Sequence, residues 1–148
     1  MKKIFIISLI VFLIDFGVKV LITKFMEIND SIILIPNFLN FTLVNNYGAA
    51  WSLFKGQGWL LVIISLSIII GVIYYIIKKK DLNTLEIIGY SFLIGGSLGN
   101  LFDRIIYGYV IDFLDFNILG YDYPIFNLAD SFIVIGIAIL VIYSFKKK

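Results

Sequence analysis

The run GWLLVIISLSIIIGVIYYII at residues 58–77 contains no charged residue and is followed directly by Lys78, Lys79 and Lys80. A helix of about twenty apolar residues covers about 30 Å, which is the thickness of the hydrocarbon core of a bilayer. The three lysines would then lie among the lipid headgroups. This stretch therefore predicts a membrane-spanning helix.

Three other parts of the chain have the same character. Apolar runs of spanning length occur at about 4–25, 84–106 and 126–145. Of the 148 residues, 61% are hydrophobic and 15% are charged, whereas a soluble domain is about half apolar and about a quarter charged. We therefore predict an all-α membrane protein, a four-transmembrane-helix bundle that forms one integral membrane domain over residues 1–148.

The first run begins like a cleavable secretory signal, because Lys2 and Lys3 precede it. However, Asp15 and Lys19 interrupt its apolar pattern, and no cleavage site with small residues follows. We therefore expect it to be retained as the first helix.

The lysines indicate the orientation of the bundle. If the chain crosses the membrane four times, eight lysines lie on one side, whereas the opposite loops contain only Lys24 and Lys55. Cytoplasmic loops are enriched in lysine and arginine, so both termini are predicted to be cytoplasmic. The eight lysines are Lys2, Lys3, Lys78, Lys79, Lys80, Lys146, Lys147 and Lys148.

Two segments, 26–57 and 107–125, are then predicted to lie on the outer side. The first contains the β-prone runs 32–35 and 38–44, which are separated by a Pro-Asn pair and closed by a turn signal. We expect a small β-rich extracytoplasmic segment there, between the first two helices. The second segment is rich in aromatic residues and is expected to be an irregular interfacial stretch.

The chain contains neither cysteine nor histidine. It therefore has no disulfide and no thiol nucleophile, and it lacks the commonest general base and metal ligand. Any catalysis would have to use carboxylates, hydroxyls, Lys, Tyr or backbone groups.

Polar side chains from three predicted helices converge in the outer half of the membrane. At about 1.5 Å per residue, they lie roughly 18–30 Å from the cytoplasmic edge. Placing an ionisable side chain inside a membrane costs on the order of several kcal/mol, so each ionisable one is a candidate functional residue. The converging residues are Asp15, Lys19, Asn100, Arg104 and Asp130.

Several of these residues have structural alternatives. Asp15 and Lys19 are spaced i, i+4 on one helix face, so they could form only an internal ion pair. Asp103 and Arg104 lie near the interface, where arginine can extend toward water. For that pair, a structural role is as plausible as a catalytic one.

Two carboxylates are harder to explain structurally. Asp130 lies within a predicted helix with no basic residue near it in sequence, and Asp112 lies in the apolar strip VIDFL. Asp115 and Asp122, by contrast, are expected to be solvated loop residues. If residues 109–116 are extended, Asp115 also points away from the face that carries Asp112.

Three kinds of chemistry fit two carboxylates in an apolar setting. The pair could share one proton and perform acid–base hydrolysis, as in aspartic proteases. The acids could instead form a proton or ion relay in a small carrier or channel subunit. They could also hold Mg²⁺ for chemistry on a lipid phosphate. Spacing alone does not choose among these three.

Four motifs occur in order along nearly the whole chain: DFGVK at 15–19, NYGAAWS at 46–52, GGSLGNLFDR with GYVIDF within 95–113, and FNLADS at 126–131. They resemble the D-x-x-x-K, N-x-G-A-A-[aromatic]-S, G-G-x-x-G-N-x-x-D-R…G-x-V-[VI]-D-[FY] and F-N-x-A-D-[SA] boxes of lipoprotein signal peptidase, also called signal peptidase II. The one departure is Trp51 at a position where that family more often has Phe.

The resemblance implies an aspartic endopeptidase of the bacterial cytoplasmic membrane. It would remove the signal peptide of diacylglyceryl-modified prolipoproteins by cleaving before the lipidated cysteine. It assigns catalysis to Asp112 and Asp130 and needs no metal or other cofactor. It assigns supporting or substrate-binding roles to Asp15, Lys19, Asn46, Asn100, Arg104 and Asn127.

The same resemblance implies an active site at the outer membrane interface of a multi-pass protein. Its partners would be prolipoprotein substrates and membrane lipid, without nucleic acid. The cyclic peptide inhibitor globomycin is expected to bind between the two aspartates, and we expect a monomer.

Overall fold

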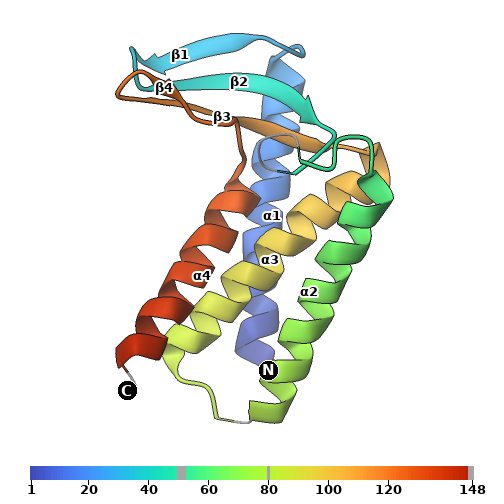
Figure 1. Ribbon diagram of the computed structural model, residues 1–148, viewed down its shortest axis with the longest axis vertical. Coiled ribbons are helices and arrows are strands. Elements are labelled where there is room, and N and C mark those ends of the chain that lie inside the picture. The colour runs from blue at the N-terminus through green and yellow to red at the C-terminus, as the bar shows by residue number, and fades with distance from the viewer. Residues whose placement is uncertain (50–52, 80, 147–148) are drawn as a thin grey trace.

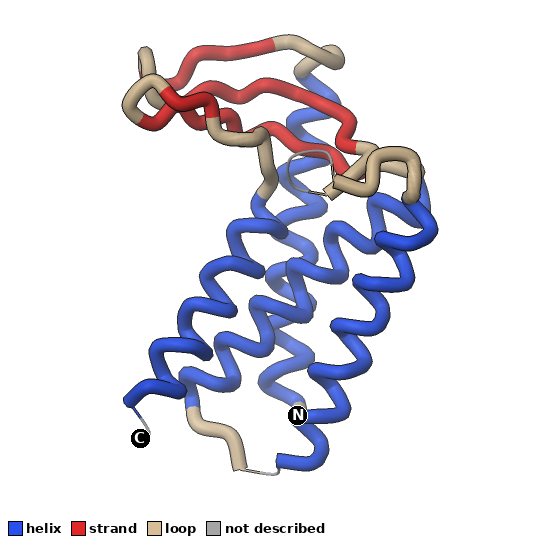
Figure 2. Tube along the Cα trace, viewed as in Figure 1, coloured by secondary structure: helices blue, strands red, loops and turns tan. Residues whose placement is uncertain are grey.

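Four long helices form a bundle with a small sheet across one end (Figure 1; Figure 2). The computed structural model describes residues 1–49, 53–79 and 81–146. Each of the four helices is long and apolar enough to cross a membrane. They are α1 (Lys2–Phe25), α2 (Gly58–Lys79), α3 (Thr84–Tyr107) and α4 (Leu128–Lys146).

Polar side chains set where two of these helices begin. Asn83 accepts a hydrogen bond from the backbone N–H of Glu86, and the Glu86 carboxylate accepts one from the backbone N–H of Asn83. This reciprocal pair is a capping box and starts α3 at Thr84. At the other end of the chain, Asn127 precedes α4, which starts at Leu128 rather than near residue 126.

The helix α3 lies at the centre of the bundle, where it packs most extensively against α4 and α1 and also contacts α2. Glycines allow the closest of these approaches. A Cβ atom added to Gly136 of α4 would lie 2.7 Å from the carbonyl oxygen of Gly89 on α3. The two backbones therefore touch, as they do where small residues line helix contacts in membranes.

An antiparallel sheet covers the end of the bundle opposite the two termini (Figure 1). Its strands lie in sequence order, and each pairs with the next. They are β1 (Ser31–Ile35), β2 (Leu39–Asn46), β3 (Val110–Ile118) and β4 (Tyr121–Asp122).

The expectation of an irregular segment at 107–125 was wrong, because β3 and β4 lie within it. The strand β3 pairs with β2, which is more than sixty residues away in sequence. Residues 110–113 are all buried, so the strand shows no alternation of apolar and polar residues. A strand that is buried on both faces gives this pattern and is hard to recognise without its partner.

A β-bulge lies in the pairing between β2 and β3. Phe41 lies opposite Leu114 and Val44 lies opposite Asp112, so two residues of β2 face the single residue Phe113. Below the sheet, Met26, Leu43 and Ile111 form a buried apolar cluster. This cluster fixes the sheet on the end of α1 and directs Asp112 toward the bundle.

Candidate active site

Asp130 is held in place by the start of α4. The backbone N–H of Asp130 donates to the side-chain oxygen of Asn127 at 2.9 Å, and the Asp130 carboxylate accepts from the backbone N–H of Asn127 at 3.3 Å. These two hydrogen bonds form a capping box in which Asp130 is the third helical residue. A carboxylate in the first turn is also stabilised by the positive end of the helix dipole.

Asp112 lies on β3 and is 1% exposed. Its Oδ2 accepts a hydrogen bond from Asn46 on β2 at 2.8 Å, and its Oδ1 accepts one from Asn127 at 2.7 Å. The strand is tied to the start of α4 because Leu114 and Phe126 exchange backbone hydrogen bonds of 2.8 and 3.1 Å. The same local structure therefore positions both carboxylates.

Asn100 and Asn127 connect the two acids. Asn100 donates to Asp130 Oδ1 at 2.7 Å, and its own oxygen accepts from Asn127 Nδ2 at 3.0 Å. Asn127 Nδ2 has two hydrogens but lies near three acceptors, including Asp112 Oδ1 and the carbonyl oxygen of Ile111. The side-chain amide of Asn127 therefore links Asp112, which it contacts directly, to Asp130, which it reaches through Asn100.

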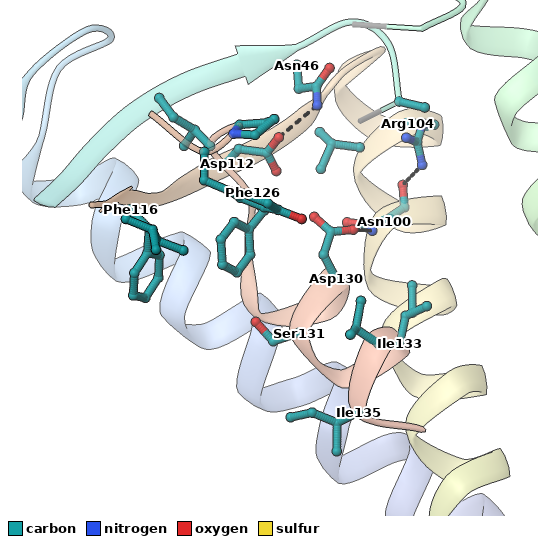
Figure 3. A pocket seen from close by; sticks show the side chains of 17 residues that line it. Asn46, Asn100, Arg104, Asp112, Phe116, Phe126, Asp130, Ser131, Ile133 and Ile135 are labelled. Atoms are coloured by element: carbon teal, nitrogen blue, oxygen red, sulfur yellow. Dashed lines mark hydrogen bonds between the residues drawn. The ribbon is translucent and has the colours of Figure 1, made fainter. Parts of the chain in front are cut away.

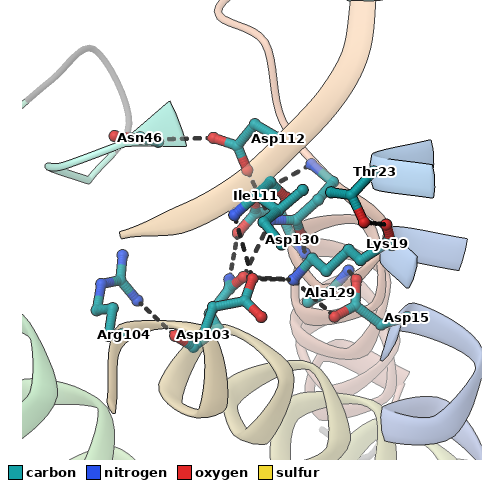
Figure 4. Close-up of polar contacts among 12 residues, drawn as sticks. Asp15, Lys19, Thr23, Asn46, Asp103, Arg104, Ile111, Asp112, Ala129 and Asp130 are labelled. Atoms are coloured by element: carbon teal, nitrogen blue, oxygen red, sulfur yellow. Dashed lines mark hydrogen bonds and ion pairs between the residues drawn. The ribbon is translucent and has the colours of Figure 1, made fainter. Parts of the chain in front are cut away.

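A buried lysine cluster lies directly behind this network (Figure 4). Lys19 is 1% exposed, and its ammonium group lies 2.7 Å from Asp15 Oδ2 and 2.8 Å from Asp103 Oδ2. Its third neighbour is the side-chain oxygen of Asn100 at 3.5 Å. Two carboxylates therefore compensate the buried ammonium charge, as a charge away from water requires.

This cluster joins three elements of the fold. Asp15 Oδ1 accepts the backbone N–H of Ala129 at 2.8 Å, in the first turn of α4. Asp103 Oδ2 accepts the backbone N–H of Ile111 at 3.1 Å, in the residue before Asp112. The cluster therefore fixes the backbone next to both candidate catalytic residues.

Arg104 contacts the loop that follows β2. Its guanidinium donates to the carbonyl oxygen of Gly48 at 3.2 Å and to that of Asn100 at 3.4 Å. In the described part of the chain, it forms no ion pair within 4.0 Å. It therefore holds this loop against α3 and does not directly neutralise either aspartate.

The two carboxyl groups line one cavity of about 580 Å³ and turn toward one another (Figure 3). Asn46, Asn100 and Arg104 supply other polar groups of its wall. The rest is mainly apolar and comes from β3, the segment before α4, and α4 itself. Those residues include Phe116, Ile118, Pro124, Ile125, Phe126, Ile133, Val134 and Ile135.

The electrostatics of Asp112 favour retention of a proton. Burial, and to a smaller extent the negative charge of Asp130, raises the pKa of Asp112 to about 7. The hydrogen bonds from Asn46 and Asn127 oppose this rise because they stabilise the charged form. Near neutral pH, the pair can therefore hold one proton between two carboxylates.

The structure brings together every residue that the sequence analysis assigned to the site. Asp103 was not among them, although it completes the lysine cluster. Its position on the same face of α3 as Asn100 was the available signal. Residues 50–52 of the NYGAAWS motif lie outside the described residues.

Asp115 was wrongly expected to be a solvated loop residue. It lies on β3, is half-buried, and accepts hydrogen bonds from Thr42 at 2.7 Å and Asn40 at 3.4 Å. Asp122 is exposed in β4 and accepts a hydrogen bond from Asn117.

Within the described residues, no group of three or more carboxylates positioned to hold a metal ion is found. The arrangement instead suits proton transfer. Two carboxylates face a shared space, and amide groups fix the orientation of each. Such a pair can activate a water molecule with one member and polarise a carbonyl group with the other.

The chain is similar to known proteins over nearly its whole length. A protein-family model for "Signal peptidase (SPase) II" matches residues 7–146 of the chain. The chain belongs to the signal peptidase II family. A lipoprotein signal peptidase of Staphylococcus aureus strain JH9 is 42% identical over 140 residues, which cover 95% of this chain and 86% of that protein.

Two solved structures have the same fold as this signal peptidase II chain. One is a bacterial membrane enzyme determined by the in meso method at 2.3 Å resolution. It has a TM-score of 0.91 and 40% identity, with 99% of this chain and 89% of that chain covered. The other was determined by the same method at 1.9 Å, with a TM-score of 0.90 and 39% identity over 100% and 96% of the two chains.

Proposed function

We propose that this signal peptidase II protein is an aspartic endopeptidase in which Asp112 and Asp130 share one proton. The observation that carries this proposal is the single cavity that both carboxylates line, with an amide hydrogen bond on each. Family membership supports the peptidase activity. The aspartic mechanism rests on the geometry and charge of the pair.

The reaction begins with a water molecule held between the two carboxyl groups. The ionised carboxylate takes a proton from this water, and the water oxygen attacks the carbonyl carbon of the scissile peptide bond. The protonated carboxyl group donates its proton to the carbonyl oxygen. When the tetrahedral gem-diol collapses, the C–N bond breaks and the leaving nitrogen takes the proton that came from the water. One hydroxyl of the gem-diol returns its proton to the other carboxylate as the new carbonyl group forms, so the pair again holds one proton.

The substrate is a diacylglyceryl-modified prolipoprotein, and cleavage occurs before the lipidated cysteine. The apolar wall supports this assignment, because Val134 and Ile135 of α4 both line the cavity and remain largely exposed. A signal peptide helix and the lipid chains can therefore reach the carboxylates without leaving an apolar environment. Asn46 and Arg104 form the polar end of the cavity, where the water molecule and the polar peptide backbone of the substrate would bind.

The orientation that we propose places both termini in the cytoplasm and the sheet on the outer side of the bacterial cytoplasmic membrane. The two termini lie at one end of the bundle (Figure 1), and Lys2, Lys3 and Lys78 lie at that same end. The positive-inside rule supports this orientation. The active site then lies at the outer interface. Lys80, Lys147 and Lys148, which also entered the prediction, lie outside the described residues.

The remaining properties that we propose follow from this function. The chain acts as a monomer and forms a single integral membrane domain. The inhibitor globomycin binds between Asp112 and Asp130, because a cyclic peptide with an apolar side can fill the same cavity as the substrate. The reaction needs no metal or other cofactor.

The distribution of buried acids is unfavourable for the alternative of a proton relay. Asp103 and Asp130 lie at the sheet end of their helices and Asp15 lies about midway along α1, whereas Glu86 lies near the opposite end and is ion-paired with Lys79. A relay needs titratable groups at successive depths. Among the described helix residues, no aspartate or glutamate lies between the depth of Asp15 and that of Glu86.

A cleavage assay tests this function directly. Purified protein in detergent is incubated with a diacylglyceryl prolipoprotein, and the products are analysed by mass spectrometry. We expect release of the intact signal peptide and a new N-terminus at the lipidated cysteine. The same precursor without the diacylglyceryl group serves as the control. Equal cleavage of both precursors, or cleavage at another bond, would contradict the proposed specificity.

A further inference from the structure

A second cavity lies at the end of the bundle opposite the sheet. It is formed where α1 begins, where α2 ends and where the connection from α2 to α3 passes. Its volume of about 610 Å³ is within the range of sites that bind small molecules. Its lining residues are Met1, Lys2, Lys3, Ile4, Ile76, Ile77, Leu82 and Ile87.

The inner part of this cavity is apolar. Ile4 and Ile76 are 4% and 2% exposed and belong to a buried cluster at this end of the bundle. Leu82 and Ile87 pack against the same cluster. The floor of the cavity is therefore a fixed surface of aliphatic side chains.

Among the described residues that line this cavity, the charged groups are the side chains of Lys2 and Lys3 and the α-ammonium group of Met1, and all of them are positive. Within the described residues, none of them forms an ion pair. Of the lysines at the end of α2 that the structure describes, Lys79 is paired with Glu86 and Lys78 lies over the ring of Tyr74. An uncompensated positive charge therefore lies above an apolar floor.

The depth of the cavity determines which ligand can reach it. It lies at the ends of membrane-spanning helices (Figure 1), where phospholipid headgroups are located. Basic pockets between helices at this depth are suited to anionic lipid headgroups. A phospholipid would place its phosphate between the two lysines and its glycerol and upper acyl carbons on the aliphatic floor.

We propose that this cavity is a binding site for an anionic phospholipid, with Lys2 and Lys3 contacting the phosphate. The proposal goes beyond the proposed peptidase function and does not depend on it. A bound lipid would link the start of α1 to the end of α2, and these two helices otherwise meet mainly through α3.

Native mass spectrometry of the full chain in neutral detergent tests this site. The probes are phosphatidylglycerol, phosphatidylcholine with the same acyl chains, and inorganic phosphate. We expect one phosphatidylglycerol to be retained in preference to the other two. Each lysine near a membrane surface contributes roughly a fivefold change in affinity, so Lys2→Gln with Lys3→Gln should weaken retention about 25-fold.

Two further variants distinguish binding in this cavity from general attraction of lipid to surface charge. Lys24→Gln with Lys55→Gln removes the same charge from the other end of the bundle and should leave retention unchanged. Ile77→Trp keeps both lysines but obstructs the cavity, and Ile77 is 57% exposed, so the bundle should tolerate it. This variant should lose phosphatidylglycerol. Equal loss in the Lys24/Lys55 variant, unchanged binding in Ile77→Trp, or equal retention of phosphate or phosphatidylcholine would overturn the proposal.

Discussion

Asp112 is nearly inaccessible to solvent and nevertheless lines the cavity, so a few neighbours control its protonation. Burial raises the pKa of Asp112 to about 7, and the folded protein retains a proton that the unfolded chain has released above about pH 4. The contribution of this group to the free energy of unfolding therefore decreases as the pH rises from about 4 to 7. Two amide groups limit that cost by donating to the carboxylate.

Replacement of one of these donors should shift the pH dependence of peptidase activity. Asn46 stabilises the charged form of Asp112, so Asn46→Ala should raise the pKa of Asp112. The decline in activity at high pH, where the pair loses its shared proton, should then move up by about one pH unit. A pH–rate profile of kcat/KM measures this shift. Asn40→Ala is the matched control, because Asn40 lies on the same strand and donates to Asp115.

At the scale of single residues, the sequence identified candidate site residues where burial of a charged side chain costs free energy. It did not identify those whose role depends on partners far away in the sequence. Asp130 and Lys19 stand out because they are ionisable in apolar helices. Asp103 is also ionisable, but its predicted place near the interface beside Arg104 left its role open, and its partners, Lys19 and the backbone N–H of Ile111, come from two other elements. Only the assembled bundle shows that Asp103 is buried.

The start of α4 is the element on which the site most depends. Its first turn is held by a capping box with Asn127, and the backbone N–H of Ala129 donates a hydrogen bond to the carboxylate of Asp15 on α1. This second contact requires close approach of α3, because Gly99 lies against the Asp15 carboxylate. A Cβ atom added at Gly99 would be 2.5 Å from Asp15 Oδ2 and 3.2 Å from the Cβ of Ala129.

Gly99→Ala should therefore lower both stability and activity. The added methyl group would displace Asp15 and Ala129, which we expect to cost about 1–3 kcal/mol of unfolding free energy. Thermal unfolding in detergent and the cleavage assay measure the two effects. Gly17→Ala is the control, because a Cβ atom at Gly17 of α1 meets nothing within 4 Å. A Gly99→Ala protein as stable and active as the Gly17→Ala protein would contradict this account of α4.

The strand β3 shows what an element-level prediction requires. The β-prone runs of β1 and β2 were visible because turn signals bound them, whereas β3 was hidden because residues 110–113 are all buried and show no alternation. Its orientation was nevertheless predictable in part. Asp112 and Asp115 differ by three positions, so an extended chain directs them to opposite faces. Asp112 lines the catalytic cavity, and Asp115 instead bonds to Thr42 and Asn40.

Asp115→Asn should accordingly be mild. The amide keeps one oxygen to accept the hydrogen bond from Thr42, so we expect activity within a few-fold of the unmodified protein and a loss of stability of about 1 kcal/mol. Parallel assays with Asp112→Asn give the comparison. If Asp115→Asn abolished cleavage as completely as Asp112→Asn, the assignment of the two faces of β3 would be incorrect.

At the scale of the whole molecule, charge and polarity divide the bundle into two ends. The sheet and the buried polar network lie at one end, and most of the lysines at the described helix ends lie at the other. This division was readable from the sequence, because span length and lysine position each depend on local composition. The pairing of β2 with β3 was not readable, because it depends on how the helices bring distant segments together.

The proposed orientation predicts a labelling pattern, and the absence of native cysteines makes the experiment simple. Single cysteines at Lys55 and Asp122, both exposed at the sheet end, should react with an impermeant thiol reagent in intact cells or spheroplasts. A cysteine at Lys78, at the opposite end, should react only after the membrane is permeabilised. The reverse pattern would place the site on the cytoplasmic side and would exclude the proposed substrate geometry.

The central claim is that Asp112 and Asp130 form one metal-free catalytic unit, and single and double Asp→Asn variants test it most directly. Asparagine preserves size but cannot exchange a proton, so each single variant should lose activity by about two orders of magnitude or more. Because the effects of removing members of one catalytic unit are not additive, the double variant should be little less active than either single variant.

Globomycin binding should be retained better than turnover, and EDTA should leave the unmodified protein active. The measurement is kcat for signal peptide release by all four proteins. Full activity of Asp130→Asn, additive losses in the double variant, or inactivation by EDTA that Mg²⁺ reverses would contradict the shared-proton pair.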